Sequence, residues 1–207
     1  MTLRNLDRIV AELEKSLDEK DRVREVSLRA ARSITRLANT ALGGMHRGGD
    51  AEKDLKALRG EVAALGKLLR DHPEFWTGGA VEGALQEASE AAIVDSVLKD
   101  RPIPGPDVLG VTDAAYVLGL GDSIGELRRV ALDRLRVGKV DEANRFVDAM
   151  EEMYHALLRF QYPDAIVAVR HKQDVARSLL ERTRGEVAVA TRSAELEGKL
   201  ARLSRRR

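Results

Sequence analysis

Apolar residues recur three and four positions apart along most of the chain, which is the spacing of residues on one face of a helix. The first such stripe runs through Leu3, Leu6, Val10, Leu13 and Leu17. Apolar and polar residues nowhere alternate over five positions, so the sequence predicts no strand. We therefore expect an all-α protein with seven helices. Their expected ranges are the N-terminal stretch to about residue 41, then 51–70, 80–99, 107–137, a fifth helix after residue 138, 163–184, and a short seventh after residue 185.

Glycine and proline residues mark the expected breaks between these helices. The segment "GGMHRGGD" (43–50) is expected to end the first helix, because glycine favours helix C-caps and turns. Gly185 is expected to separate the last two helices. The Pro/Gly-rich linker "DRPIPGPD" (100–107) is short, so it reads as a connection within one domain. We expect a single domain over residues 1–207, with a frayed basic tail at 199–207.

Composition narrows the class of protein. The 207 residues are 43% hydrophobic and 33% charged, which allows a folded core, and the net charge of +1 does not by itself predict a nucleic-acid partner. Any attraction for phosphate must come from local clustering of basic residues. There is no cysteine, and no uncharged run approaches the ~20 residues of a membrane span. The charged N-terminal stretch resembles no signal peptide, and a cytoplasmic protein is expected.

Two pairs of carboxylates stand apart from the other charges. Glu87 and Glu90 are the only charged residues in "GALQEASEAAIV", and Asp122 and Glu126 are the only ones in "AAYVLGLGDSIGEL". Spacings of three and four put each pair on one helical face. Such groups among apolar neighbours need a compensating cation or donor, and carboxylate oxygens suit Mg²⁺ or Mn²⁺. The alternatives are ion pairs with a neighbouring helix, or a wet channel without chemistry.

Two further features admit structural or chemical interpretations. Glu152 and His155 form one Glu-x-x-His motif, the unit of di-iron bundles, but no second copy exists, so His155 is expected to be a polar helix residue. Gly119, Gly121 and Gly125 lie inside a predicted helix, where each glycine costs ~1 kcal/mol relative to alanine. Close helix crossing is the favoured reason, and room for a metal or RNA backbone is the alternative.

The segments carrying these carboxylates also resemble a known family. "DVLGVTDAAYVLGLGDSIGELRR" (107–129), "LQEASEA" (85–91) and "VRHKQDVARSLLERTRGE" (169–186) resemble blocks of the translin family, and most closely those of translin-associated factor X (TRAX). The resemblance covers about residues 5–190. The chain lacks the basic N-terminal extension of eukaryotic factor X and has a reduced linker, which suggests a prokaryotic, archaeal-type homologue.

The resemblance implies a fold and an activity. The family is all-α with seven helices, and it assembles into hollow octamers that bind single-stranded RNA and DNA. Factor X subunits are Mg²⁺-dependent endoribonucleases, whose acidic residues match Glu87, Glu90, Asp122 and Glu126 of this sequence. We therefore expect a catalytic subunit in a homo-octameric shell. A non-catalytic single-strand-binding scaffold like translin is the alternative, and a helical interaction protein without nucleic acid is a third.

Basic residues near the acidic pairs are candidates for RNA contacts. They are Arg128, Arg129, Arg170 and Lys172. Each could instead be solvated or ion-paired, since Asp174 and Glu181 are available as local partners. Tyr116, Tyr154 and Trp76 could stack on bases, but with so few aromatic residues they are expected to pack in the core.

Overall fold

The computed structural model describes residues 5–204, and all regular structure within that range is helical. The all-α prediction is therefore confirmed. The elements are α1 (Leu6–His46), α2 (Glu52–Leu68), the short 3₁₀ helix η1 (Pro73–Phe75), α3 (Gly79–Leu98), α4 (Pro106–Leu109), α5 (Asp113–Arg136), α6 (Val140–Leu157) and α7 (Arg170–Ser204).

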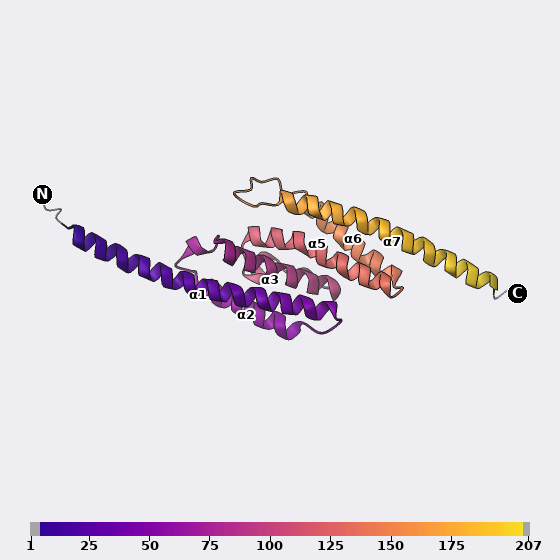
Figure 1. Ribbon diagram of the computed structural model, residues 1–207, viewed down its shortest axis with the longest axis horizontal. Helices are drawn as coiled ribbons and strands as arrows, with labels where there is room; N and C mark the ends of the chain where they lie inside the picture. Colours follow the sequence, from indigo (N-terminus) through magenta and orange to yellow (C-terminus); the bar gives the residue numbers. More distant parts are fainter. Residues whose placement is uncertain (1–4, 205–207) are drawn as a thin grey trace.

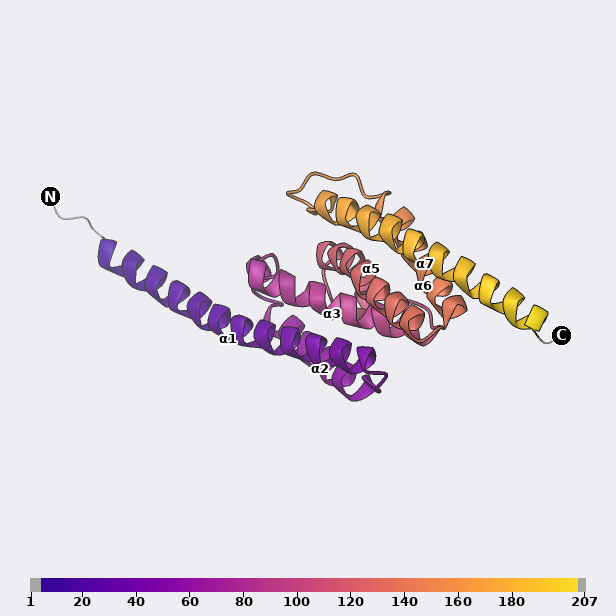
Figure 2. The ribbon, with the colours of Figure 1, turned by 45° about the vertical axis from the view of Figure 1, so that its right-hand side comes forward.

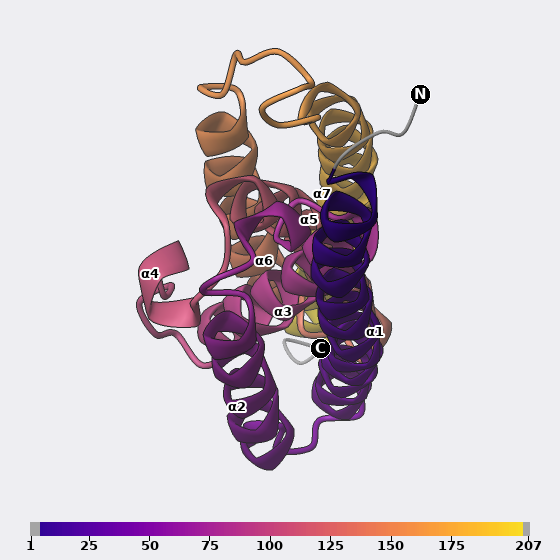
Figure 3. The same cartoon turned by 90° about the vertical axis from the view of Figure 1, so that its left-hand side faces the viewer.

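Four helices lie side by side in the order α1, α3, α5, α7 (Figure 1). The shorter helix α2 packs against α1, and α6 packs against α5 and α7. A view along the long axis of the molecule shows α2 and α6 on the same side (Figure 3). The two outer helices extend past the packed body in opposite directions (Figures 1 and 2). The centre of the molecule is therefore the contact between α3 and α5.

Two hydrophobic clusters hold this arrangement together. The first joins α1, α2 and α3 through residues such as Ile34, Leu65 and Leu85. The second joins α5, α6 and α7 through residues such as Ile124 and Met150, and it reaches α3 at Ile93. The predicted core roles of the aromatic residues hold, because the side chains of Trp76, Tyr116 and Tyr154 are half-buried against these clusters.

The helix predicted over 107–137 is interrupted near its start, so that prediction was wrong in its first turns. α4 ends at Gly110, whose φ of 71° is the left-handed conformation that glycine adopts without strain. α5 then begins anew after Thr112, whose hydroxyl accepts a hydrogen bond from the Ala115 N–H at 3.2 Å. A left-handed glycine followed by a capping threonine therefore separates two helices here.

The C-terminal helices also differ from the prediction. Residues 163–169 form turns instead of a helix, and α7 starts only at Arg170. It then runs without a break through Gly185, because Thr183 and Val187 on either side are buried against neighbouring helices. That packing outweighs the ~1 kcal/mol cost of one helical glycine. The tail expected to fray over 199–207 is helical as far as Ser204, and its last three residues lie outside the described range.

The first helix is longer at its C-terminal end than expected. It continues past residue 41 through Gly43 and Gly44 to His46, because Leu42 and Met45 in its last turns are buried in the first cluster. Gly48, with φ of 73°, then makes the turn to α2. The extra turn matters because it carries His46 into the interior.

Both outer helices present apolar side chains to solvent where they extend beyond the body. On α1 these are Leu6, Ile9, Val10, Leu13 and Leu17, the last 63% exposed. On α7 they are Val189, Leu196, Leu200 and Leu203. Contiguous exposed apolar stripes of this kind mark interaction surfaces more often than free surface. Separately, no helix within residues 5–204 combines the length and apolarity needed to cross a membrane.

Candidate functional site

The four sequence-predicted carboxyl groups meet where α3 crosses α5. Glu87 and Glu90 come from α3, and Asp122 and Glu126 come from α5. All three other carboxylates act electrostatically on Glu90, which places the four in one neighbourhood. We refer to these four residues as the acidic cluster.

Glycine on α5 makes this approach possible. A Cβ on Gly119 would lie 2.6 Å from the Gln86 carbonyl oxygen and 2.7 Å from the Ser89 Cβ, both on α3. A Cβ on Gly121 would lie 2.9 Å from the Lys172 Cβ of α7. Close helix crossing is thus confirmed as the reason for these two glycines, whereas Gly125 has ordinary contact distances to its neighbour.

Glu90 is the most buried member of the acidic cluster. Its residue is 8% exposed, and within residues 5–204 no hydrogen bond or ion pair satisfies its carboxyl group. Burial, reinforced by Asp122, Glu87 and Glu126, raises the pKa of Glu90 to about 8. Burial also raises the pKa of Glu87, with Asp122 adding to the effect and Lys172 opposing it.

Asp122 is held from both sides. The Lys172 ammonium of α7 lies 2.5 Å from Asp122 Oδ1, and the Gln86 amide of α3 donates to Oδ2. Lys172 was predicted from the sequence as an RNA contact, and the structure places its ammonium beside the acidic cluster; the RNA contact stays a prediction. It is the one cation that faces the four carboxyl groups among the described residues.

Glu126 has a partner that the sequence did not suggest. His46, from the last turn of α1, contacts Glu126 Oε2 through its Nε2. The imidazole side chain is only 5% exposed, and its Nδ1 is buried without a hydrogen-bond partner among the described residues. The one sequence signal was a histidine in the glycine-rich segment at the end of a helix, and nothing there connected it to a residue 80 positions later.

The chemistry of the acidic cluster suits a hard divalent cation. Four carboxyl groups offer oxygen ligands, and one ammonium leaves their charge largely uncompensated. Within residues 5–204, however, no three His, Asp or Glu side chains converge as metal ligands do. Both oxygens of Asp122 have protein partners, Lys172 and Gln86, so binding a cation requires that side chain to turn. Glu126 is held through Oε2 alone, and its Oε1 has no partner among the described residues.

Comparison with known proteins places this arrangement in a family. No protein-family model matches the chain. The uncharacterized protein MJ0175 of Methanocaldococcus jannaschii is 32% identical over 190 residues, which covers 90% of this chain and 85% of that protein. The structure of AfC3PO, a translin-type protein, is 31% identical with a TM-score of 0.82 over 89% of this chain and 97% of its own. The chain belongs to the translin family.

Two other family structures extend the comparison. AfC3PO in complex with duplex RNA is 30% identical to this chain, with a TM-score of 0.81 and the same coverage as the structure without RNA. Apo-NeC3PO is 23% identical with a TM-score of 0.75, and it covers 92% of this chain and 99% of its own. The latter likeness concerns the translin fold alone.

The four basic residues predicted to contact RNA divide into different environments in this translin-family chain. Arg128 links α5 to α7, because it donates to the Thr183 hydroxyl at 2.6 Å and pairs with Glu186 at 3.0 Å. Arg129 and Arg170 are exposed, and neither has a hydrogen bond or ion pair within the described range. Arg129 lies one turn beyond Glu126 on the same face of α5 as Asp122 and Glu126.

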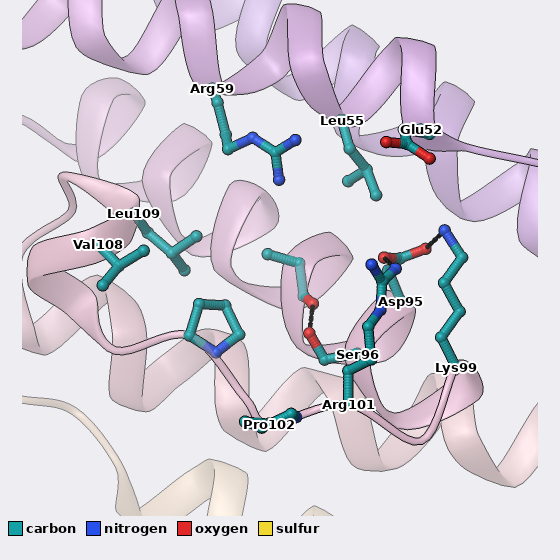
Figure 4. A pocket seen from close by; sticks show the side chains of 12 residues that line it. Glu52, Leu55, Arg59, Asp95, Ser96, Lys99, Arg101, Pro102, Val108 and Leu109 are labelled. Atoms are coloured by element: carbon teal, nitrogen blue, oxygen red, sulfur yellow. Dashed lines mark hydrogen bonds and ion pairs between the residues drawn. The ribbon is translucent and has the colours of Figure 1, made fainter.

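A separate polar pocket contains a buried carboxylate that, unlike that of Glu90, is paired with cations. A pocket of about 200 Å³ lies between α2, the end of α3 and the segment around α4 (Figure 4). Asp95 lines it at 7% exposure, with Lys99 Nζ 2.8 Å from one oxygen and an Arg101 guanidinium nitrogen 2.9 Å from the other. These pairs tie the linker after α3 back to the helix, so a structural role accounts for this charge.

The remaining histidine prediction is also settled by geometry. His155 is exposed on α6 and lies 3.5 Å from Glu151, one turn earlier on the same helix. It has no part in the acidic cluster, as expected for a polar helix residue.

Proposed function

We propose that this protein is an endoribonuclease that depends on a divalent metal ion, Mg²⁺ or Mn²⁺, held by Glu87, Glu90, Asp122 and Glu126. The observation that carries the proposal is the buried, unpaired carboxyl group of Glu90 beside three other carboxylates. A protein interior tolerates such a concentration of charge only with a compensating cation or at the cost of protonation. The arrangement thus favours the catalytic, factor X type of translin-family subunit.

The substrate we propose is RNA. AfC3PO, at 30% identity, forms a complex with duplex RNA, and the sequence resemblance implies single-stranded RNA. Arg129 and Arg170 are exposed and unpaired among the described residues, so both are available to phosphates. Binding of single-stranded DNA is a weaker expectation of the same surface.

The residues of the chain have separable roles in this reaction. A bound divalent cation would supply a water of lowered pKa and stabilise charge on the scissile phosphate. Attack by water would break the P–O3′ bond and leave a 5′-phosphate and a 3′-hydroxyl. Glu87 and Glu90, whose pKa values are raised, are the carboxyl groups suited to accept the water proton. Lys172, which pairs with Asp122 in the absence of a cation, would be free to meet a phosphate oxygen if Asp122 turned to the cation.

We further propose that the chain forms a hollow homo-oligomer, an octamer by family resemblance. The support is the pair of apolar stripes on the projecting ends of α1 and α7, which a single copy leaves exposed. Light scattering on the purified chain would measure its mass. Leu13→Glu and Leu17→Glu on α1 should reduce that mass, because each places a charge in the proposed contact. A location in the cytoplasm remains the prediction from the cysteine-free composition.

One observation favours the alternative, a scaffold that binds RNA without cutting it. Asp122 and Glu126 already have protein partners, and no three ligand side chains of residues 5–204 converge. If Lys172 and Gln86 never release Asp122, the acidic cluster is a network of hydrogen bonds and ion pairs around one protonated glutamate.

The two functions are separated by cleavage of a labelled RNA. Purified protein is incubated with single-stranded and duplex RNA in Mg²⁺ or in EDTA, as wild type and as Glu126→Ala. The proposal expects cleavage in Mg²⁺ that EDTA and the substitution both abolish, with RNA retention unchanged. Asp148→Ala, on the exposed side of α6, is the matched control and should cleave normally. Retention of RNA without cleavage under any divalent metal would establish the scaffold instead.

A further inference from the structure

The His46 side chain is buried beside the acidic cluster, and it has no role in the proposed reaction. It reaches Glu126 from α1, which packs on α2 and α3, so the contact joins the two halves of the molecule. Within the described residues, the side chain of Glu126 is the one hydrogen-bond or ion-pair partner of the His46 side chain, and the reverse also holds.

The environment of the ring makes a purely structural role costly. Nδ1 is buried and has no hydrogen-bond partner among the described residues, and a buried polar atom without a partner destabilises a fold. A leucine in the same space would add apolar surface beside Leu98 and Val130, which line the same pocket, and would leave no orphaned atom. The feature that an imidazole provides and leucine lacks is the hydrogen bond to the carboxylate.

That hydrogen bond engages Oε2 of Glu126 and leaves Oε1 available for another partner. The Glu126 side chain is 25% exposed, and no residue between 5 and 204 pairs with its Oε1. A glutamate on a helix has three rotatable side-chain bonds, so a donor on one oxygen removes much of the freedom of the other. Protein groups that orient metal-binding side chains in this manner typically change metal affinity 10–100-fold when removed.

We propose that His46 is a positioning residue for the acidic cluster: its Nε2–H donates to Glu126 Oε2 and holds Oε1 toward Glu90 and the cation. This role rests on the proposed metal-dependent function. The donor is assigned to Nε2 because that is the ring nitrogen in contact with Glu126. His46 acts through Glu126 and touches neither substrate nor cation.

The test compares two substitutions that differ in the hydrogen-bond donor. His46→Leu removes the donor and keeps an apolar side chain of similar size, whereas His46→Gln keeps an N–H that can reach Glu126. The first readout is the affinity of the metal-free full chain for Mn²⁺, followed by the electron paramagnetic resonance signal of the free ion. The second is the kcat and KM of RNA cleavage, and the third is the thermal unfolding midpoint. His155→Leu, an exposed histidine beside a glutamate, is the matched control.

We expect His46→Leu to weaken Mn²⁺ binding roughly 10–100-fold and to lower kcat, with KM for RNA unchanged and the unfolding midpoint equal or higher. His46→Gln should recover most of the loss, and His155→Leu should behave as wild type. If His46→Leu does not fold, His46→Asn replaces it, since its shorter side chain cannot reach Glu126. If folded His46→Leu or His46→Asn binds Mn²⁺ as tightly as wild type, the positioning role is overturned and the proposed function still stands. Absence of Mn²⁺ binding by the wild type would overturn the proposed function, and this role with it.

Discussion

Two carboxylates of α3 are buried to the same extent and have opposite surroundings. Glu90 is 8% exposed and Asp95, five residues later, is 7% exposed. Asp95 has a lysine on one oxygen and an arginine on the other, so its charge is neutralised where it lies. Glu90 faces three further carboxyl groups, and its pKa is raised to about 8. Burial alone therefore does not distinguish the two carboxylates, whereas the presence or absence of a paired cation does.

The same contrast applies to two neighbouring arginines of α5. Arg128 is 17% exposed in its side chain and joins α5 to α7 through Thr183 and Glu186. Arg129 faces solvent without a partner among the described residues. Charges that the fold has paired support its structure, and charges that it leaves unpaired are available to a ligand.

The largest effect on activity is expected when Glu90 and Asp95 are each replaced by the corresponding amide. Glu90→Gln should lower the rate of Mg²⁺-dependent RNA cleavage about 100-fold or more, because a ligand and proton acceptor is lost, while its stability near pH 8 should rise. Asp95→Asn should leave cleavage intact and lower the free energy of unfolding by about 1 kcal/mol, because the buried carboxylate that pairs with Lys99 and Arg101 is lost. Cleavage rates and urea unfolding of both variants check this. Equal loss of activity in the two would remove the distinction between them.

The next effect concerns the dependence of stability on pH. The pKa of Glu90 is about 8 in the folded protein against 4.5 as its ordinary value, so between these pH values the folded state keeps a proton that the unfolded state releases. The free energy of unfolding should therefore fall as the pH rises from about 5 to 8, by up to ~1.4 kcal/mol per unit. Urea unfolding in EDTA of wild type and Glu90→Gln measures the difference. Parallel pH profiles for the two proteins would mean that Glu90 is ionised throughout.

A smaller effect tests the helix crossing that brings the carboxylates together. Gly119→Ala should destabilise the fold by about 2 kcal/mol, although alanine favours helices, because its Cβ would meet backbone of α3 at 2.6 Å. Gly125→Ala, with its nearest neighbour at 3.7 Å, should be neutral or stabilising by up to ~1 kcal/mol. Thermal unfolding of the two variants is the measurement. A stable Gly119→Ala variant would show that α3 and α5 do not cross this closely.

The smallest effect on RNA binding is expected from substitution of Arg128 or Arg129. Arg129→Ala should weaken RNA binding a few-fold and reduce the slope of log affinity against log salt by about 1, as loss of one phosphate contact does. Arg128→Ala should instead lower stability and leave that slope unchanged. Filter binding over a salt series separates them. A reduced slope for Arg128→Ala alone would reverse the assignment.

The acidic cluster could be predicted because its signal is local. Glu87, Glu90, Asp122 and Glu126 stand alone in apolar, glycine-containing helices, and that isolation is visible without a structure. The partner of Glu126 could not be predicted in this way. His46 comes from another helix 80 residues earlier, and only the packing of α1 on α3 brings it near.

Helix boundaries failed where tertiary packing or capping overrides a single residue. Gly185 was expected to end a helix, but buried neighbours on both sides carry α7 through it. Conversely, hydrophobic periodicity predicted one continuous helix over 107–137. That helix is divided by Gly110, which is left-handed, and by Thr112, which caps α5. The capping pattern was present in the sequence, whereas the burial around Gly185 depends on contacts with α5 and α6 that periodicity does not specify.

The most direct test of the account is a Mn²⁺ titration of the metal-free protein as wild type, Glu90→Gln and Asp95→Asn. If unpaired buried carboxylates form a cation site, wild type and Asp95→Asn bind Mn²⁺ with equal affinity, and Glu90→Gln binds it more than about tenfold more weakly. Unchanged affinity in Glu90→Gln, or no saturable binding by the wild type, would contradict the claim that the acidic cluster exists to hold a metal ion.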